Sequence, residues 1–395
     1  MIRHRLLAAR ASLASSFLLL AACSGTSPTA SDHASAADTE SALGSSARRT
    51  HDADRVFVLG NDATNEVVVF DAPDGGTLRE IDRVATGGRG SGDALGSQGA
   101  IVLSGDGRWL YAVNAGSSEL SLFRVRRGHI ELADVVPSGG ERPVSVTESR
   151  GLVYVLNAGG TPNVSGFTLD DHGALRGLDG SARALSRASG VGAAQVGFSP
   201  DGDAIVVTEK MTNTIDSFVV RRDGTLTDAR TLRSIGDTPF GFAFDAAGTL
   251  VVSDAFGGAA GSGALSSYRL DRGALASLVT GPVADHESAP CWVVITRDGR
   301  YAYTSNTASG SISGYAVTTA GAIALIAGAG GTASTGDASA PIDMTLDDEG
   351  RTLYVLQEGM HAVGAFHIAS DGSLSSTGNV GGLPPHAVGL AASRR

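Results

Sequence analysis

Short runs of alternating apolar and polar residues recur along the chain from residue 55 onwards. Six of the seven runs follow a tight turn that contains a glycine, and these glycines lie 44 to 51 residues apart. Alternation with a period of two, bounded by Asp-Gly and similar turns, predicts antiparallel hairpin strands. The turn glycines are Gly107, Gly151, Gly202, Gly248, Gly299 and Gly350. The runs after them are WLYAVN, LVYVLN, AIVVTE, LVVSD, YAYTSN and TLYVLQ, and VFVLGN at 56–61 is a seventh copy.

The seven copies also share a register. Each run ends on a polar residue, and an aromatic residue follows nine positions later in five copies, ten in one and 14 in one. The polar residues are Asn61, Asn114, Asn157, Glu209, Asp254, Asn306 and Gln357, and the aromatic residues are Phe70, Phe123, Phe167, Phe218, Tyr268, Tyr315 and Phe366. Each repeat contains four candidate strands, and four antiparallel strands repeated radially form a propeller blade. The sequence therefore predicts an all-β fold, a seven-bladed β-propeller over residues 55–395.

The two ends of the repeat region predict how the ring closes. The first repeat lacks an inner strand, whereas the chain ends with a spare one, PHAVGLAA at 385–392. We expect this segment to pair with 56–61, because closure removes the unpaired edges that a sheet otherwise exposes.

The first 22 residues have the layout of a secretion signal. Three arginines precede an apolar run at 11–22, which is too short to cross a bilayer as a helix. The run ends in LAAC, which is similar to the cleavage site of bacterial lipoproteins. We expect cleavage before Cys23 and lipidation of this cysteine. The alternative is an ordinary signal for soluble secretion.

Residues 23–54 are rich in Ser, Ala, Thr and Asp, and they contain few large apolar side chains. Such a segment buries too little surface to offset its ordering entropy, so we expect a flexible tether. The expected location is the bacterial cell envelope, with the membrane reached through the lipid anchor alone. Ser24 follows the cysteine, which favours the outer membrane if the host is Gram-negative.

Charge and cysteine content exclude several classes of function. The net charge of −11 becomes −14 without the signal, which contains three of the 30 basic residues and no acid. A nucleic-acid partner needs a basic surface, so we expect none. With Cys23 lipidated, Cys291 has no partner for a disulfide, and we expect it to be a small buried apolar residue. Motifs for a metal, a phosphate loop or a cofactor are absent from the sequence, and we expect a monomer.

The loops predict which face of the propeller has a function. The turns between first and second strands are short and repetitive. The turns between second and third strands and the connections between blades are longer and more varied, such as 86–98, 177–195, 256–263 and 281–290. Variable loops on a rigid scaffold are the usual place for binding, so we expect the site on this loop face, at the mouth of the central channel.

Candidate site residues end a second strand or lie at the start of an inner strand. We expect a principal pocket bounded by Gln98, Arg142, Gln195, Glu209, Asp254 and Trp292, with Lys210, Asn306 and His386 as further ligand-binding candidates. Glu209 and Asp254 belong to successive repeats, so two carboxylates are expected on one side of the opening. The alternatives are local: asparagines at strand ends initiate turns, and Glu209 and Lys210 form a surface ion pair.

Three segments resemble a known family: FSPDGDAIVVTEKMTNTIDSFVV, PFGFAFDAAGTLVVSDAFGG and APCWVVITRDGRYAYTSNTASGSISGYAV. They are similar to the lactonase-type seven-bladed propellers, which include 6-phosphogluconolactonases and carboxymuconate cycloisomerases. The resemblance spans about residues 55–392. It implies histidine, arginine and glutamate around the channel mouth, and Glu209 and Arg142 match this expectation. Gln195 stands where the family leads us to expect a histidine, and a Pro-His pair occurs at Pro385-His386.

Two functions are consistent with these residues. The first is a surface-anchored binding module that holds a small polar ligand, a glycan or a protein on the loop face. The second is a lactone hydrolase or cycloisomerase with Glu209 as general base and Lys210 or Arg142 at the oxyanion. Gln195 favours binding because an amide cannot shuttle a proton near neutral pH.

Overall fold

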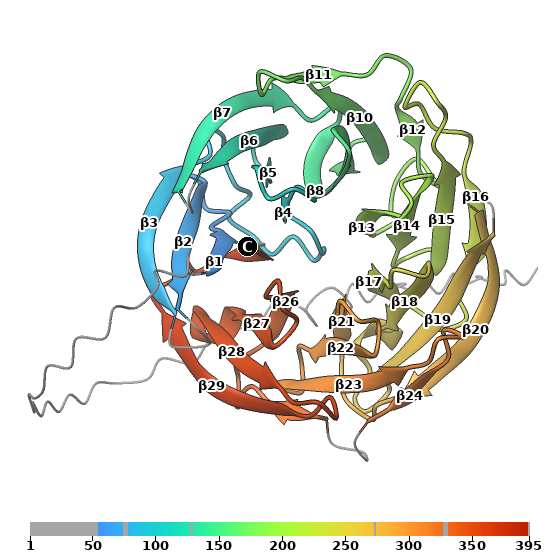
Figure 1. The fold of residues 1–395 in the computed structure, drawn as a ribbon. Helices are drawn as coiled ribbons and strands as arrows, with labels where there is room; N and C mark the ends of the chain where they lie inside the picture. Colours follow the sequence, from blue (N-terminus) through green and yellow to red (C-terminus); the bar gives the residue numbers. More distant parts are fainter. Residues whose placement is uncertain (1–53, 74–77, 127–128, 272–273, 327–330, 394–395) are drawn as a thin grey trace, which may run out of the picture.

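The chain folds into seven antiparallel sheets arranged around a central axis (Figure 1). The computed structural model describes residues 54–73, 78–126, 129–271, 274–326 and 331–393. In six of the seven sheets the strands follow one another in chain order from the axis outwards, and in the first sheet the last strand of the chain, β30, takes the innermost place. The prediction of an all-β, seven-bladed propeller is therefore confirmed. The predicted signal at 1–22, the predicted lipidation site Cys23 and most of the predicted tether at 23–54 lie outside the described residues.

The two strands nearest the axis come from the repeats recognised in the sequence. The innermost strands are β4 (Ile101–Leu103), β8 (Glu141–Ser149), β13 (Ala193–Phe198), β17 (Pro239–Phe244), β21 (Pro290–Ile295), β26 (Pro341–Leu346) and β30 (Val388–Ala392). The second strands are β1 (Asp54–Leu59), β5 (Trp109–Asn114), β9 (Leu152–Gly159), β14 (Ala204–Glu209), β18 (Thr249–Asp254), β22 (Tyr301–Asn306) and β27 (Thr352–Gln357).

The outer strands are less regular. The third strands are β2 (Glu66–Ala72), β6 (Glu119–Arg126), β10 (Asn163–Leu169), β15 (Thr214–Val219), β19 (Ala264–Asp271), β23 (Ser311–Val317) and β28 (Ala362–Ile368). The fourth positions hold β3 (Arg79–Ala85), β7 (His129–Pro137), β11 (Leu175–Gly177) with β12 (Arg183–Ala184), β16 (Arg230–Arg233), β20 (Ala274–Ala284), β24 (Ile323–Leu325) with β25 (Ala333–Ser334), and β29 (Leu374–Gly381). Two short 3-10 turns, η2 (Phe256–Gly258) and η3 (Glu358–Met360), follow second strands.

The spacing of aromatic residues in the sequence reflects the pairing of second and third strands. In six of the seven blades the aromatic residue of the third strand lies opposite the second residue of the second strand, as in Leu110↔Phe123 and Leu250↔Tyr268. These aromatic side chains are buried and fill the blade cores. In blade five the longer turn that contains η2 accounts for the spacing of 14, and the register is unchanged.

The last strand closes the ring as predicted. β30 pairs antiparallel with β1, from Val56↔Ala392 to Leu59↔Val388. The paired segment is shorter than the expected 385–392, because the chain turns before β30, where the Ala387 amide donates to the Pro384 carbonyl. Beyond the strand, the Arg55 amide donates to the Ser393 hydroxyl at 2.8 Å.

The connection from β3 to β4 crosses the central channel (Figure 1). The Gln98 side chain, in blade two's connection, exchanges two hydrogen bonds with the backbone of Val293 in blade six, at 2.8 and 3.0 Å. The Trp292 indole also donates to the Ser97 carbonyl at 3.0 Å. We call residues 94–99 the channel segment. Its residues Ala94, Leu95 and Gly96 line the cavity described below.

The inner strands turn one edge toward the channel, and side chains of other blades form hydrogen bonds with some of the backbone groups on these edges. The Gln195 amide in β13 accepts from the Phe242 amide at 2.7 Å and donates to its carbonyl at 3.0 Å, on β17. Buried backbone groups need such partners. Within the described residues, none of the helical turns is long or apolar enough to span a bilayer.

Candidate functional site

A cavity of about 280 Å³ opens on the loop face, beside the channel segment. Its walls come from the connections that enter blades two to six and from the turns that follow β14 and β18. The lining residues are Ala94, Leu95, Gly96, Arg142, Ala158, Gly190, Val191, Gly192, Ala193, Lys210, Met211, Thr238, Phe240, Ala255, Gly257, Gly258, Ala289 and Cys291. The cavity therefore lies on the face that carries the longer loops, on the side of the ring formed by blades two to six.

Two cationic side chains line this cavity, and both contact the channel segment. The Lys210 ammonium donates to the Gly96 carbonyl and lies 4.4 Å from the centre of the Phe240 ring. The Arg142 guanidinium reaches the Ala94 carbonyl at 3.4 Å. An ammonium over an aromatic face is attracted by the ring quadrupole. The cavity thus presents positive charge to anything that enters it.

An aromatic pair supports Lys210 from below. The Phe240 and Trp292 rings lie 5.0 Å apart and are tilted by 52°, a favourable geometry for aromatic contact. Trp292 is buried and its indole is bonded to the channel segment, so it does not line the cavity. Its role in the geometry is to hold the ring on which Lys210 rests.

Close packing makes glycine necessary at one wall. Gly192 has a φ of +66°, and a Cβ at this position would lie 2.7 Å from the Cγ of Met211. A left-handed backbone and so close an approach both favour glycine. The Met211 side chain packs against this glycine and is 59% exposed.

Glu209 precedes Lys210 in the sequence, but it lies outside the cavity. Its carboxylate is completely buried and accepts hydrogen bonds from the Ser186 amide at 2.9 Å, the Thr212 hydroxyl at 2.6 Å, the Thr214 hydroxyl at 3.1 Å and the Ser186 hydroxyl. Burial acts to raise the pKa of Glu209, but the hydrogen bonds from Ser186 and Thr212 outweigh it and hold that pKa below its usual value. Glu209 therefore ties the turn after β14 to the preceding connection.

The partner carboxylate of Glu209 is Asp216, which the sequence pattern did not single out. Asp216 is buried on β15, and the Thr231 hydroxyl donates to it. Burial raises the pKa of Asp216 to about 7, and the nearby charge of Glu209 acts in the same direction. In the sequence, Asp216 is distinguished only as a carboxylate in the middle of the run TIDSFV, next to the apolar residue Ile215.

Asp254 is also buried within its own blade. Its oxygens accept from the Ser234 hydroxyl at 3.4 Å and from the Ser266 hydroxyl. Burial raises the pKa of Asp254 to about 7 despite these bonds. Asn306 has the equivalent position in blade six and donates to Ser311 and Ser313 at 3.0 and 2.8 Å.

The expectation of two carboxylates at one side of the opening is therefore corrected. Glu209 and Asp254 each face the outer strands of a blade, because hydroxyl groups there satisfy the buried oxygens. Of the expected pocket residues only Arg142 lines the cavity, together with the further candidate Lys210. Gln98 and Trp292 join the channel segment to β21, and Gln195 joins β13 to β17. His386 is half-buried in the turn before β30, outside this lining.

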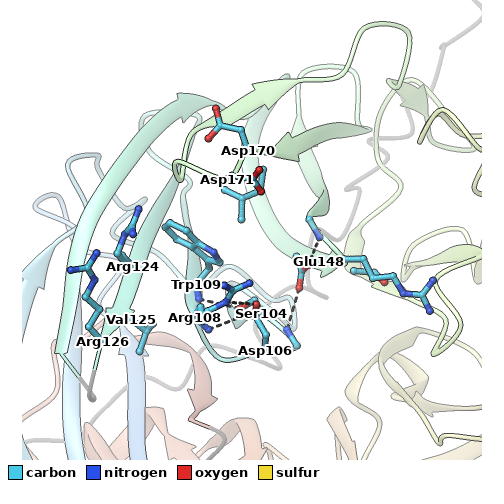
Figure 2. Close-up of a pocket in the computed structure, with 15 residues that line it drawn as sticks. Ser104, Asp106, Arg108, Trp109, Arg124, Val125, Arg126, Glu148, Asp170 and Asp171 are labelled. Carbon is cyan, nitrogen blue, oxygen red and sulfur yellow. Dashed lines mark hydrogen bonds and ion pairs between the residues drawn. The ribbon is translucent and has the colours of Figure 1, made fainter.

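A larger groove, of about 660 Å³, lies on the opposite face between blades two and three (Figure 2). Arg124 lies 4.7 Å above the Trp109 ring, and the Arg108 guanidinium bonds Asp106 at 2.6 Å. A groove of about 600 Å³ lies at the equivalent turns of blades six and seven, where Arg300 lies 5.0 Å from the centre of the Tyr301 ring. Grooves at these turns therefore recur with the repeat, although Arg300 comes from the turn before β22 and Arg124 comes from the third strand β6.

Among the described residues, no group of three or more His, Cys, Asp and Glu side chains is arranged to hold a metal ion. The fold and the cavity define a closed seven-bladed propeller with a small cationic pocket on its loop face. The chain belongs to the lactonase family of seven-bladed β-propellers, whose model matches residues 29–184, 161–255 and 262–389. A search of curated proteins found no match.

Solved structures show the same fold at low sequence identity. The periplasmic gluconolactonase of Pseudomonas aeruginosa is 15% identical, with a TM-score of 0.66 over 86% of this chain and 99% of that one. A Bacteroides uniformis protein provisionally assigned as a 6-phosphogluconolactonase is 20% identical, with a TM-score of 0.65 over 86% and 99%. A Lactobacillus plantarum protein is 19% identical, with a TM-score of 0.66 over the same shares.

Proposed function

We propose that this propeller binds a small anionic ligand in the loop-face cavity. The observation that carries the proposal is the composition of the lining: it includes Lys210 and Arg142 and, among the described residues, no carboxylate and no imidazole. An anion gains from both cations in a partly enclosed site where water screens charge poorly. Small-molecule sites in general are apolar concavities with a few convergent polar groups, and the cavity has this character.

Lactone hydrolysis is a second candidate, because the chain belongs to the lactonase family. The relatives named as gluconolactonase and 6-phosphogluconolactonase support it at the level of fold. In this cavity Lys210 and Arg142 would stabilise the oxyanion that forms when water attacks the lactone carbonyl. Glu209, the expected base, is enclosed by Ser186, Thr212 and Thr214, so the described lining supplies no general base. This geometry favours binding over turnover.

The test is a binding measurement with a panel of small carboxylates and phosphates, by isothermal titration calorimetry. We expect at least one to bind the wild type and to lose tenfold or more in affinity in Lys210→Gln and in Arg142→Gln. Arg126→Gln is the matched control, because Arg126 lies in the groove of the opposite face. The proposal would be overturned if no compound of the panel bound, or if both cavity variants bound as tightly as the wild type. Hydrolysis of a lactone panel that is lost in Lys210→Gln would favour the second candidate.

We also propose that the domain works at the cell envelope. The LAAC sequence at 20–23 and the polar segment after it support lipid anchoring through Cys23. An anionic protein gains little from anionic headgroups, so the acyl chains would provide the attachment.

A further inference from the structure

The walls of the loop-face cavity carry very few groups that form hydrogen bonds through their side chains. Ten of the 18 lining residues are glycine or alanine, and four more are Leu95, Val191, Met211 and Phe240. The remaining four are the two cations, Cys291 and Thr238. Within the part of the chain that the structure describes, Thr238 thus supplies the one hydroxyl in the lining of this cavity.

The Thr238 hydroxyl already has a structural contact. It accepts a hydrogen bond from the Gly257 amide at 3.0 Å, and this bond holds the η2 turn against the connection that enters blade five. A polyhydroxy acid would therefore give up the hydrogen bonds of its hydroxyls to water and find few side-chain groups in the walls to replace them. Unpaired polar groups in an enclosed site oppose binding.

The rim points to an apolar ligand body. Met211 is 59% exposed, although its side chain borders the cavity beside Gly192. Leu95 and Val191 are buried at the walls next to it. Methionine adapts its shape to irregular apolar surfaces, and an exposed one at the mouth of a pocket gains apolar burial when a hydrocarbon group enters.

We propose that the ligand is a small apolar carboxylate, with one carboxylate on an aliphatic or cyclic hydrocarbon, and that sugar acids are poor ligands. The carboxylate lies between Lys210 and Arg142, and the hydrocarbon contacts Leu95, Val191 and Met211. This inference rests on the proposed anion site and names its ligand class. The volume of about 280 Å³ suits a molecule of roughly ten non-hydrogen atoms, at the small end of ligand pockets.

Three probes of similar size separate the contributions: cyclohexanecarboxylate, its neutral amide, and erythronate, a sugar acid with as many non-hydrogen atoms as cyclohexanecarboxylate. By calorimetry, we expect cyclohexanecarboxylate to bind at least tenfold more tightly than either of the others. Lys210→Gln should remove most of the difference between acid and amide, whereas Lys210→Arg should keep it. Met211→Ala should weaken the acid and the amide alike, by threefold or more. Melting curves of each variant show that it is folded.

The outcomes distinguish this inference about the ligand class from the proposed anion site on which it rests. If erythronate binds more tightly than cyclohexanecarboxylate and its binding depends on Lys210, the ligand class is wrong and the anion site stands. If cyclohexanecarboxylate binds but neither Lys210→Gln nor Met211→Ala changes its affinity, the site lies elsewhere and both are wrong. If neither acid binds, and the broader panel of anions fails as well, both proposals are overturned.

Discussion

Neighbouring residues in this propeller serve opposite purposes. Glu209 and Lys210 are adjacent in the sequence, yet one carboxylate is enclosed among hydroxyls and one ammonium lines the cavity. Successive side chains at a strand end point to opposite sides. Glu209 thus stabilises blade four, whereas its neighbour Lys210 belongs to the candidate site.

The role of Glu209 leads to a prediction about stability. Glu209→Gln replaces one acceptor oxygen with an NH₂ group that faces donors from Ser186 and Thr212. We expect the free energy of unfolding to fall by about 1–3 kcal/mol, the usual cost of a lost bond to a buried charged group. Chemical denaturation measures this, and Glu131→Gln on the exposed face of β7 is the control. A variant of unchanged stability with lost ligand binding would instead place Glu209 in the site.

Asp254 predicts a pH dependence. Its pKa in the folded protein is raised to about 7 by burial, whereas an aspartate in the unfolded chain titrates near pH 4. The folded state therefore holds this proton more tightly, so its contribution is full below about pH 4 and is lost as the pH rises to about 7. We expect Asp254→Asn to reduce the fall in unfolding free energy between pH 4.5 and 8 by about 1–4 kcal/mol. Denaturation curves for both proteins at several pH values test it, and parallel curves would show that Asp254 does not titrate there.

At the scale of elements, the sequence predicted the strands well because their pattern is local. The spacing from Asn114 to Phe123 follows directly from hairpin register, and in blade five the same register is kept although the turn before Tyr268 is longer. The cavity could not be predicted in the same way. Most of its lining residues are glycines and alanines from five blades, and such residues do not mark a binding site in a sequence. Arg142 and Lys210 were found because they are charged, whereas the direction of Glu209 and Asp254 depends on hydroxyls such as Ser186 and Ser266 elsewhere in the chain.

The closing strand gives a prediction at the same scale. Truncation after Gly382 removes β30 and leaves β1 without its inner neighbour. We expect the melting temperature to fall by roughly 10 °C or more, or the cooperative transition to disappear, because the backbone of a buried strand loses its partners. Circular dichroism measures the transition, with truncation after Ser393 as the control that keeps β30. Equal melting of the two truncated proteins would contradict this view of closure.

At the scale of the whole molecule, the anchoring proposal concerns the attachment of the domain to the membrane. We expect wild-type protein to incorporate a labelled fatty acid and to sediment with membranes, and Cys23→Ser to do neither. Cys291→Ala is the matched control, because this cysteine is buried in the propeller. Equal labelling of Cys23→Ser and wild type would show that the anchor lies elsewhere.

The bond between Gln98 and Val293 also bears on how such a ring can change in evolution. Repeat proteins whose units contact only their neighbours can gain or lose a unit by unequal recombination, since every junction is alike. Here a side chain of the second blade spans the ring to a fixed position in the sixth. Insertion or loss of a blade between them would change the diameter and the angle that this link must cover. The channel segment thus ties the number of blades to a single geometry, and duplication of a repeat in this chain would require the crossing to be rebuilt.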